Sequence, residues 1–254
     1  MTHVADERAL QLHVAPAKES ASSWLRDTVA PLPLDLRVAF EEAYFASPLA
    51  YGGQYDRANP PRKLASYLRE VREAKPGGAL LDVGCAFGRF LEVAAPHYTC
   101  EGLDVSRYAL SHARRRVPDI PLYQAAIQDF VVDRRYDIIT CFDVLEHVPE
   151  LEQALSRLRA LLAPEGVLVA AVPVYDTPMG WAVGMIDRDP THLHRWSRDA
   201  WMNRLQTAGY SARIMKGIVR IPLPGYFLHG ISTRWRTWAA AILVVCTQAA
   251  EGAT

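Results

Sequence analysis

Leu80-Leu81-Asp82-Val83-Gly84-Cys85-Ala86-Phe87-Gly88 is the stretch of sequence that decides the fold. An apolar run leads into a turn of small residues, and a helical pattern begins directly after it. Gly84 and Gly88 let the backbone turn tightly and let a ligand approach closely, because glycine carries no Cβ atom. The stretch therefore predicts a strand, a ligand-binding loop and a helix in succession.

Apolar runs alternate with helical patterns along the rest of the chain. The runs expected to form buried strands span residues 79–83, 100–105, 122–127, 137–142, 167–172, 212–218 and 240–247. Helical spacing of apolar residues is found at 89–95, 108–116, 151–162 and 198–208. The alternation predicts an α/β fold with a doubly wound, mostly parallel, seven-stranded sheet and helices on both faces. Such sheets bind ligands beyond the carboxyl ends of their strands.

The N-terminal part of the chain differs in character from the rest. Residues 1–59 are expected to form a lead-in and lid segment, and residues 60–254 the ligand-binding domain. Aromatic side chains crowd the segment 35–55 around Gly52-Gly53, namely Phe40, Tyr44, Phe45, Tyr51 and Tyr55. One interpretation is an aromatic flank packed on the core. The other is a partly helical cap that closes over the active site about the two glycines.

Composition narrows the class of partner and the compartment. Lys and Arg total 28, as do Asp and Glu, so a nucleic-acid partner is not expected. The four cysteines lack metal-binding spacing and are expected to be buried, reduced thiols, so no metal site is predicted. Residues 1–19 lack a signal-peptide core, and the longest apolar run, 238–246, is too short to cross a membrane. We expect a soluble, cytoplasmic protein without membrane contact.

The charges around the glycine loop indicate the kind of ligand. The glycines are spaced G-x-x-x-G rather than G-x-G-x-x-G, and Asp82 precedes the turn, where a carboxylate would repel a pyrophosphate. The same carboxylate suits a ligand that carries an ammonium and a sulfonium group. Asp104 ends the second expected strand, where a carboxylate can accept hydrogen bonds from two ribose hydroxyls. These acids favour adenosine joined to methionine over adenosine joined to phosphates.

Four stretches carry a resemblance to a known family. Residues 82–88 resemble the first motif, usually D-x-G-x-G-x-G, of class I S-adenosylmethionine (SAM) dependent methyltransferases. Residues 102–106 look like the acidic second-strand motif of that family, and residues 162–168 resemble the turn before its fifth strand. Phe142-Asp143-Val144-Leu145-Glu146-His147-Val148 is similar to the fourth-strand motif of the small-molecule branch, which includes ubiquinone-biosynthesis and natural-product enzymes.

The resemblance implies a Rossmann-like fold with SAM as the cofactor. The residues that it implies for cofactor binding are Asp82, Gly84, Cys85, Ala86, Gly88, Asp104, Val105, Ala126, Ile127, Phe142 and Asp143. The sequence departs from the family pattern at two places. Ala86 stands where glycine is usual, and no Asp is found near Ala125 or Ala126 to bond the adenine amino group. Backbone groups and Gln128 or Asp129 are expected to hold the adenine instead.

The candidate catalytic residues lie beyond the fourth and fifth strands. His192, in the polar loop 187–197, is the favoured general base or substrate orienter, followed by Asp189 and His194. Similar D-x-T-H segments occur in related small-molecule methyltransferases. The alternative is that these loop histidines are bonded to backbone groups. For His147 we favour a structural or cofactor-side role, although a histidine can act as a base near neutral pH.

These residues predict SAM-dependent methyl transfer to a hydroxyl of a small-molecule metabolite, such as a natural-product intermediate. An in-line displacement with a loop histidine as base accomplishes this without a metal. N-methylation and a non-catalytic SAM-binding protein are the alternatives. A nicotinamide-dependent oxidoreductase is disfavoured by the glycine spacing, and the (N/D)-P-P-(Y/F) class by residues 142–145. Residues 221–229, rich in proline and aromatics, are candidates to close the pocket or to support a homodimer.

Overall fold

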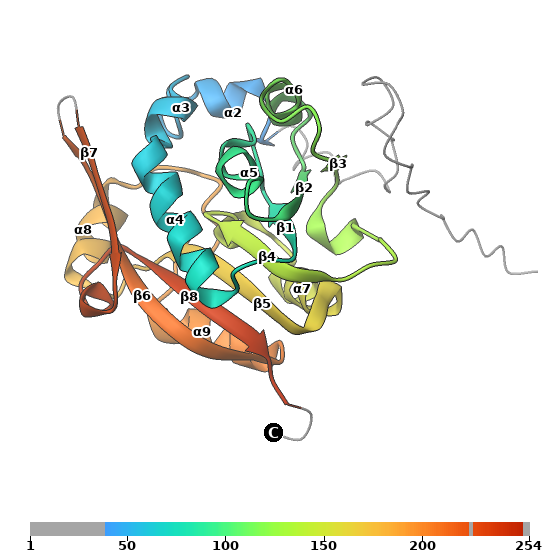
Figure 1. The fold of residues 1–254 in the computed structure, drawn as a ribbon. Coiled ribbons are helices and arrows are strands. Elements are labelled where there is room, and N and C mark those ends of the chain that lie inside the picture. Colours follow the sequence, from blue (N-terminus) through green and yellow to red (C-terminus); the bar gives the residue numbers. More distant parts are fainter. Residues whose placement is uncertain (1–38, 224–225, 251–254) are drawn as a thin grey trace, which may run out of the picture.

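The computed structural model describes residues 39–223 and 226–250, which form a mixed sheet with helices on both faces (Figure 1). The strands are β1 (Ala79–Val83), β2 (Thr99–Asp104), β3 (Leu122–Gln124), β4 (Tyr136–Phe142), β5 (Leu162–Pro173), β6 (Tyr210–Leu223), β7 (Tyr226–Ser232) and β8 (Ala241–Gln248). Their order is β3-β2-β1-β4-β5-β8-β6-β7. The first five pair in parallel, whereas β8 runs antiparallel to both β5 and β6.

The helices occupy two layers. The longer ones are α4 (Pro61–Ala74), α5 (Arg89–Ala94), α6 (Arg107–Arg116), α7 (Leu151–Leu161), α8 (Pro178–Ile186) and α9 (Arg198–Thr207). The shorter ones are α2 (Glu42–Ala46), α3 (Tyr55–Ala58) and the 3-10 turns η1 (Ile127–Asp129), η2 (Leu145–His147) and η3 (Thr233–Trp235). Helices α4 and α5 lie on one face of the sheet, and α7 and α9 lie on the other (Figure 1).

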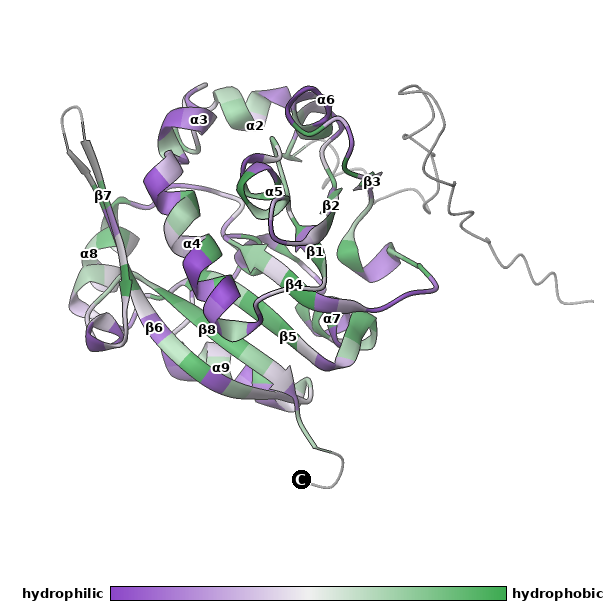
Figure 2. Cartoon of the chain, viewed as in Figure 1, coloured by the Kyte–Doolittle hydropathy of each residue, from purple (hydrophilic) through white to green (hydrophobic). Residues whose placement is uncertain are grey.

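The central strands are buried on both faces. Leu80 packs in the core beneath α4 and α5, while its neighbour Leu81 packs in the core beneath α7 and α9. The same alternation occurs at Ile138 and Ile139, because successive side chains of a strand point to opposite faces. The apolar colouring of β1, β4, β5 and β8 in Figure 2 follows from this double burial. A continuous apolar run is therefore the signature of each of these strands.

The doubly wound α/β architecture that the sequence predicts is confirmed, and the strand count is corrected. The described residues form eight strands rather than seven. Part of the stretch expected to be an insert, 221–229, instead extends β6 and returns as β7 in an antiparallel hairpin. Beyond Ile218, β6 pairs with β7 and no longer with β8, so Pro222 lies where its missing N–H breaks no pairing with β8.

Other local predictions can be compared with the structure. Ser197 caps α9, the helix expected at 198–208, since its Oγ accepts a hydrogen bond from the amide of Ala200 at 3.1 Å. All four cysteines are buried and free, also as expected. Helix α8 was not anticipated. Of the expected lead-in and lid, residues 1–38 lie outside the described residues. In the part of the chain that the structure covers, no helix combines the length and apolar character needed to span a bilayer.

Candidate active site

A pocket opens at the carboxyl ends of the parallel strands, where the sheet order reverses between β1 and β4. Its volume is about 1200 Å³, including the part that is open to solvent. Ten of the eleven residues implied for cofactor binding line it: Asp82, Gly84, Cys85, Ala86, Asp104, Val105, Ala126, Ile127, Phe142 and Asp143. Gly88 is not part of this wall. It precedes α5 as the N-cap residue with a φ of 73°, and a Cβ atom there would press on Val117 and Ala113.

The glycine loop packs so closely on its neighbours that a side chain at position 84 would not fit. Gly84 has a φ of 71°, and a Cβ atom at this position would lie 2.3 Å from Cγ2 of Val144. Ala86 also has a positive φ, 45°, although it carries a Cβ atom. Its amide donates a hydrogen bond of 2.8 Å to Oδ2 of Asp104, which ties the loop to the end of β2. The backbone around the pocket is therefore held in a conformation that L-residues seldom adopt.

Two buried carboxyl groups face this loop. Asp82 accepts a hydrogen bond of 2.7 Å from the Thr140 hydroxyl, and burial raises its pKa to about 7. Asp104 accepts from the amides of Ala86 and Ser106, both at 2.8 Å, and burial raises its pKa to about 6. Burial disfavours the charged form of an acid, whereas a nearby cation favours it. A cationic ligand in the pocket would thus stabilise both carboxylates.

The aromatic roof, which we define as residues 39–58, covers the pocket. Phe40, Tyr44, Phe45, Tyr51 and Tyr55 all line it. Phe45 also packs on Phe87 and Tyr108, with ring centroids 4.8 and 5.8 Å apart. The carboxylate of Glu41 accepts hydrogen bonds from the amides of Arg107 and Tyr108 at 2.9 and 3.0 Å. The segment both flanks the core and covers the pocket, and a lid movement remains a prediction.

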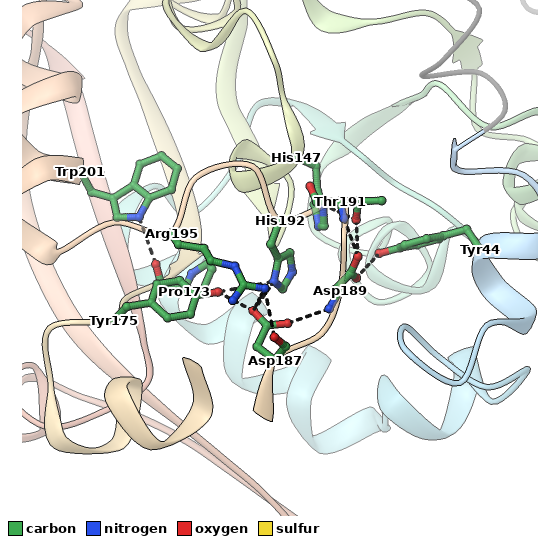
Figure 3. Close-up of polar contacts among 10 residues, drawn as sticks. All are labelled: Tyr44, His147, Pro173, Tyr175, Asp187, Asp189, Thr191, His192, Arg195 and Trp201. Atoms are coloured by element: carbon green, nitrogen blue, oxygen red, sulfur yellow. Dashed lines mark hydrogen bonds and ion pairs between the residues drawn. The ribbon is translucent and has the colours of Figure 1, made fainter. Parts of the chain in front are cut away.

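The loop 187–197 holds two polar groups (Figure 3). In the first, Nδ1 of His192 lies 2.7 Å from Oδ2 of Asp187. The Tyr175 hydroxyl donates to the same oxygen at 2.7 Å, and Nη2 of Arg195 is 3.5 Å from it. Burial alone would raise the pKa of Asp187, but the hydrogen bonds from His192, Tyr175 and the Asp189 amide together lower it. Asp187 is therefore a carboxylate that orients His192.

The second group joins Asp189, Thr191, His147 and Tyr44. The Thr191 hydroxyl donates to Oδ1 of Asp189 at 2.6 Å, and the Tyr44 hydroxyl donates to Oδ2 at 3.5 Å. Nδ1 of His147 lies 3.0 Å from the Thr191 carbonyl, which can only accept, so this nitrogen carries the proton. Burial lowers the pKa of His147 to about 4, so its ring is neutral at pH 7 and Nε2 is unprotonated.

The structure places the predicted catalytic residues differently. His147 lines the pocket, and the ring of His192 lies behind it with centroids 4.8 Å apart. Among the described residues that line the pocket, His192, Asp189 and His194 are absent. Nε2 of His194 donates to the Val148 carbonyl at 2.7 Å, and its ring stacks on Trp196. His194 is therefore bonded to a backbone group, as the alternative interpretation of the loop histidines stated. The fold brings His147, Asp189 and His192 close together.

Sequence reasoning missed several polar residues around the pocket. Glu146 is 1% exposed, and burial raises its pKa. Among the described residues, Glu146, His147 and His192 form the one group whose potential metal-ligand atoms lie within 4.8 Å of one another. Lys63 lines the pocket, and Arg220 lies beside Asp143. A charged residue on the apolar face of a helix, as Lys63 is on α4, could have indicated the first of these two cations.

The chain is similar in sequence to known methyltransferases. A family model described as a methyltransferase domain matches residues 55–213. A dTDP-3-amino-3,6-dideoxy-alpha-D-glucopyranose N,N-dimethyltransferase of Streptomyces fradiae is 36% identical over 148 residues, covering 55% of this chain and 58% of the relative. A ubiquinone biosynthesis O-methyltransferase of Actinobacillus pleuropneumoniae is 34% identical over 121 residues, covering 43% and 51%. The chain thus spans little more than half the length of these relatives.

Solved structures share the fold at low sequence identity. A possible histamine N-methyltransferase from Thermotoga maritima aligns with a TM-score of 0.61 and 16% identity, covering 78% of this chain and 95% of that one. The N-methyltransferase NodS from Bradyrhizobium japonicum, in complex with S-adenosyl-L-homocysteine, aligns with a TM-score of 0.57 and 18% identity, covering 82% and 95%. These similarities concern the architecture of the sheet and its helices.

Proposed function

Because the chain belongs to the methyltransferase domain family and SAM is its cofactor, we propose that it methylates a hydroxyl of a small molecule with His192 as general base. The observation that carries the proposal is the 2.7 Å contact between His192 Nδ1 and the Asp187 carboxylate. It lies at the carboxyl edge of the sheet, next to the pocket. The two small-molecule relatives described above support a small molecule as the acceptor.

The residues of the pocket fit the cofactor. SAM, when bound, supplies a methyl group that a positively charged sulfur activates for displacement. Asp104, at the end of β2, can accept hydrogen bonds from ribose hydroxyls through lone pairs that the two amides leave free. Gly84 and Ala86 allow the ligand to approach the backbone. Asp82 provides a buried carboxyl that gains stability from a nearby positive charge.

Proton removal distinguishes the two histidines. Among the described residues, His192 has a carboxylate on its Nδ1 atom, which fixes the proton there and leaves Nε2 free to accept a proton. The Asp187 carboxylate would then stabilise the imidazolium. His147 contacts Thr191 instead, and its low pKa makes it a poor proton acceptor. We therefore assign proton removal to His192 and positioning of the acceptor to His147, whose unprotonated Nε2 can accept a hydrogen bond.

A second candidate is N-methylation of an amino sugar. It is favoured by the 36% identity with the Streptomyces fradiae sugar N,N-dimethyltransferase. A neutral amine needs no base before it attacks, so His192 would matter little for its methylation. The non-catalytic alternative, a SAM-binding protein, predicts cofactor binding without turnover on any acceptor.

The test compares His192→Ala with wild type on acceptors of both kinds. S-adenosylhomocysteine binding is measured by calorimetry, and methyl transfer is measured on phenolic acceptors and on nucleotide-linked amino sugars. We expect turnover of a hydroxyl acceptor to fall roughly 10²–10⁴-fold in the variant, with cofactor affinity unchanged. His97→Ala, at an exposed position, is the matched control. Amine methylation that survives in His192→Ala would instead establish N-methylation as the function. Absence of turnover on every acceptor tested would support the non-catalytic SAM-binding protein.

A further inference from the structure

Asp189 is among the residues that the sequence predicts to be catalytic, yet it does not belong to the described wall of the pocket. It is 6% exposed, and both of its carboxyl oxygens accept hydrogen bonds. Oδ1 accepts from the amide and the hydroxyl of Thr191 at 2.9 and 2.6 Å, and Oδ2 accepts from the Tyr44 hydroxyl at 3.5 Å. Any part that Asp189 plays in the reaction is therefore exerted through the residues that it holds.

On the loop side, Asp189 supports both histidines. The Thr191 carbonyl accepts a hydrogen bond from Nδ1 of His147 at 3.0 Å, and the Thr191 hydroxyl oxygen lies 2.9 Å from the same nitrogen. The Asp189 amide donates at 3.1 Å to Oδ1 of Asp187, the carboxylate that orients His192. Asp189 is therefore the residue at which the two polar groups of this loop join (Figure 3).

On the other side, Tyr44 brings the aromatic roof to the same residue. Its ring lines the pocket together with those of Phe40 and Tyr51, whose centroids lie 5.0 and 5.8 Å from its own. Burial raises the pKa of the Tyr44 hydroxyl well above its ordinary value, so the group keeps its proton and acts as a donor. One side chain thus borders the cofactor pocket and donates to Asp189.

We propose that Asp189 is a positioning residue that couples cofactor binding to the order of loop 187–197. A cofactor that packs against Tyr44 favours the arrangement of the roof in which the Tyr44 hydroxyl donates to Asp189. Asp189 in turn holds Thr191, and through it His147. By linkage, an ordered loop raises the cofactor affinity by the same factor. The inference rests on SAM as the ligand of the pocket, and its consequence for turnover rests on the proposed function.

The loop is of a kind that can open locally. Between α8 and α9 the chain is fully described and forms neither helix nor strand. The amides of Leu193 and His194 both donate to the Glu146 carbonyl, at 2.9 and 3.2 Å. The Thr191 amide donates to Asp189 instead. A segment held by so few hydrogen bonds opens at a lower free energy than the sheet, so exchange of these three amides reports on the order of the loop.

Hydrogen exchange followed by mass spectrometry tests the coupling, with S-adenosylhomocysteine as the probe. In wild type, saturating ligand should slow exchange in peptides covering 187–197 about 3- to 10-fold, the effect of one hydrogen bond. Tyr44→Phe should still bind the ligand, which calorimetry checks, but the ligand should no longer slow exchange in the loop. Asp189→Ala should leave the loop unprotected with and without ligand. Unchanged exchange on binding to wild type would overturn the proposal.

Tyr51→Phe is the matched control. Tyr51, a second tyrosine of the roof, packs on Tyr44 without donating to Asp189. Its variant should therefore retain the slowed exchange of the loop once the ligand is saturating. Protection in Tyr44→Phe equal to that in wild type would overturn the proposal. Loss of protection in both tyrosine variants would assign the effect to general packing of the roof and would overturn it as well.

The affinity for S-adenosylhomocysteine supplies a second measurement. Tyr44→Phe and Asp189→Ala should each weaken binding about 3- to 10-fold, and the double variant should lose no more, because both changes remove the same link. Additive losses would mean that the two residues act independently and would overturn the coupling. On a phenolic acceptor that is methylated, Tyr44→Phe should lower kcat/KM by a similar factor. Exchange and affinity need no acceptor, so they decide the coupling even where methyl transfer with His192 as base fails.

Discussion

Nδ1 of His192 lies 2.7 Å from Oδ2 of Asp187, and the Tyr175 hydroxyl donates to the same carboxylate oxygen. The contact places the ring proton on Nδ1 and directs Nε2 away from Asp187. The carboxylate is itself fixed by Tyr175 and by the Asp189 amide. A histidine held in this way combines a defined tautomer with a defined direction, which are the two requirements for a general base.

Asp187→Asn should therefore impair proton removal more than binding. The amide can donate to Nδ1 and reverse the tautomer, so we expect turnover of a hydroxyl acceptor to fall by about 10²-fold or more. Tyr175→Phe is the matched comparison, because it removes the contacts of the Tyr175 hydroxyl with Asp187 and with Nδ1 of His192 but keeps the contact between Asp187 and His192. Its turnover should fall less than about 10-fold. Steady-state kinetics checks both, and equal effects of the two substitutions would contradict the orienting role.

Asp82→Asn should change how stability depends on pH. Burial raises the pKa of Asp82 to about 7 in the folded chain, against about 3.9 when unfolded. The folded state therefore binds the extra proton between about pH 4 and pH 7, and the free energy of unfolding declines across that window as the pH rises. The variant lacks this decline. Its advantage over wild type should be near zero at pH 4 and on the order of 4 kcal/mol at pH 8, because each unit of pKa difference corresponds to about 1.4 kcal/mol.

Urea unfolding of the ligand-free proteins at several pH values measures this difference. The hydrogen bond from Thr140 is not a confounding change, because the Asn amide oxygen can accept it. A stability difference between variant and wild type that stays constant from pH 4 to pH 8 would show that Asp82 is not the group responsible.

Ala86→Gly tests the departure from the usual family motif. Ala86 has a φ of 45°, a conformation that glycine adopts without strain. We expect the free energy of unfolding to rise by up to about 1 kcal/mol. The same change at Ala65, exposed in the middle of α4, should lower it by about 0.5–1 kcal/mol. Urea unfolding measures the change in the free energy of unfolding at both positions. Changes of opposite sign would identify the backbone conformation of residue 86 as the cause, and changes of the same sign would exclude it.

Glu41→Ala should loosen the aromatic roof. The Glu41 carboxylate accepts hydrogen bonds from the amides of Arg107 and Tyr108 at the first turn of α6, where a negative charge is favourable. Losing these hydrogen bonds should destabilise the conformation in which the aromatic roof covers the pocket by about 1 kcal/mol. We expect S-adenosylhomocysteine to dissociate roughly 5-fold faster in stopped-flow measurements, since 1.4 kcal/mol corresponds to a factor of 10. Glu42→Ala, at an exposed neighbouring position, is the control. Unchanged dissociation would place the exit route elsewhere.

The parallel half of the sheet and the cofactor loop could be predicted because their determinants are local. The run ending in Val83 and the glycine at position 84 dictate a buried strand and a tight turn within a few residues. Helix α9 could be placed from Ser197 and the apolar spacing after it. Helix α8 was missed because it is apolar around most of its circumference, so no periodic face reveals it.

The polar residues of the site were harder to predict because their partners are distant in sequence. Asp187 precedes His192 by five positions, but only the folded loop shows that the two side chains meet. Arg220 reaches Asp143 across the sheet from β6, and nothing near either residue in the sequence indicates the pairing. His194 illustrates the converse, since a promising sequence context ends in a bond to the Val148 carbonyl.

The position of β8 has a consequence for how the chain is built during translation. β8 is the last of the described strands in the sequence, yet it lies between β5 and β6 in the sheet. The N-terminal strands can pair as they leave the ribosome, whereas β6 has no place beside them until residues 241–248 have been synthesised. Arg220 travels with β6. We therefore expect the glycine loop to be able to form early, and Asp143 to acquire its guanidinium partner only once β8 has joined the sheet.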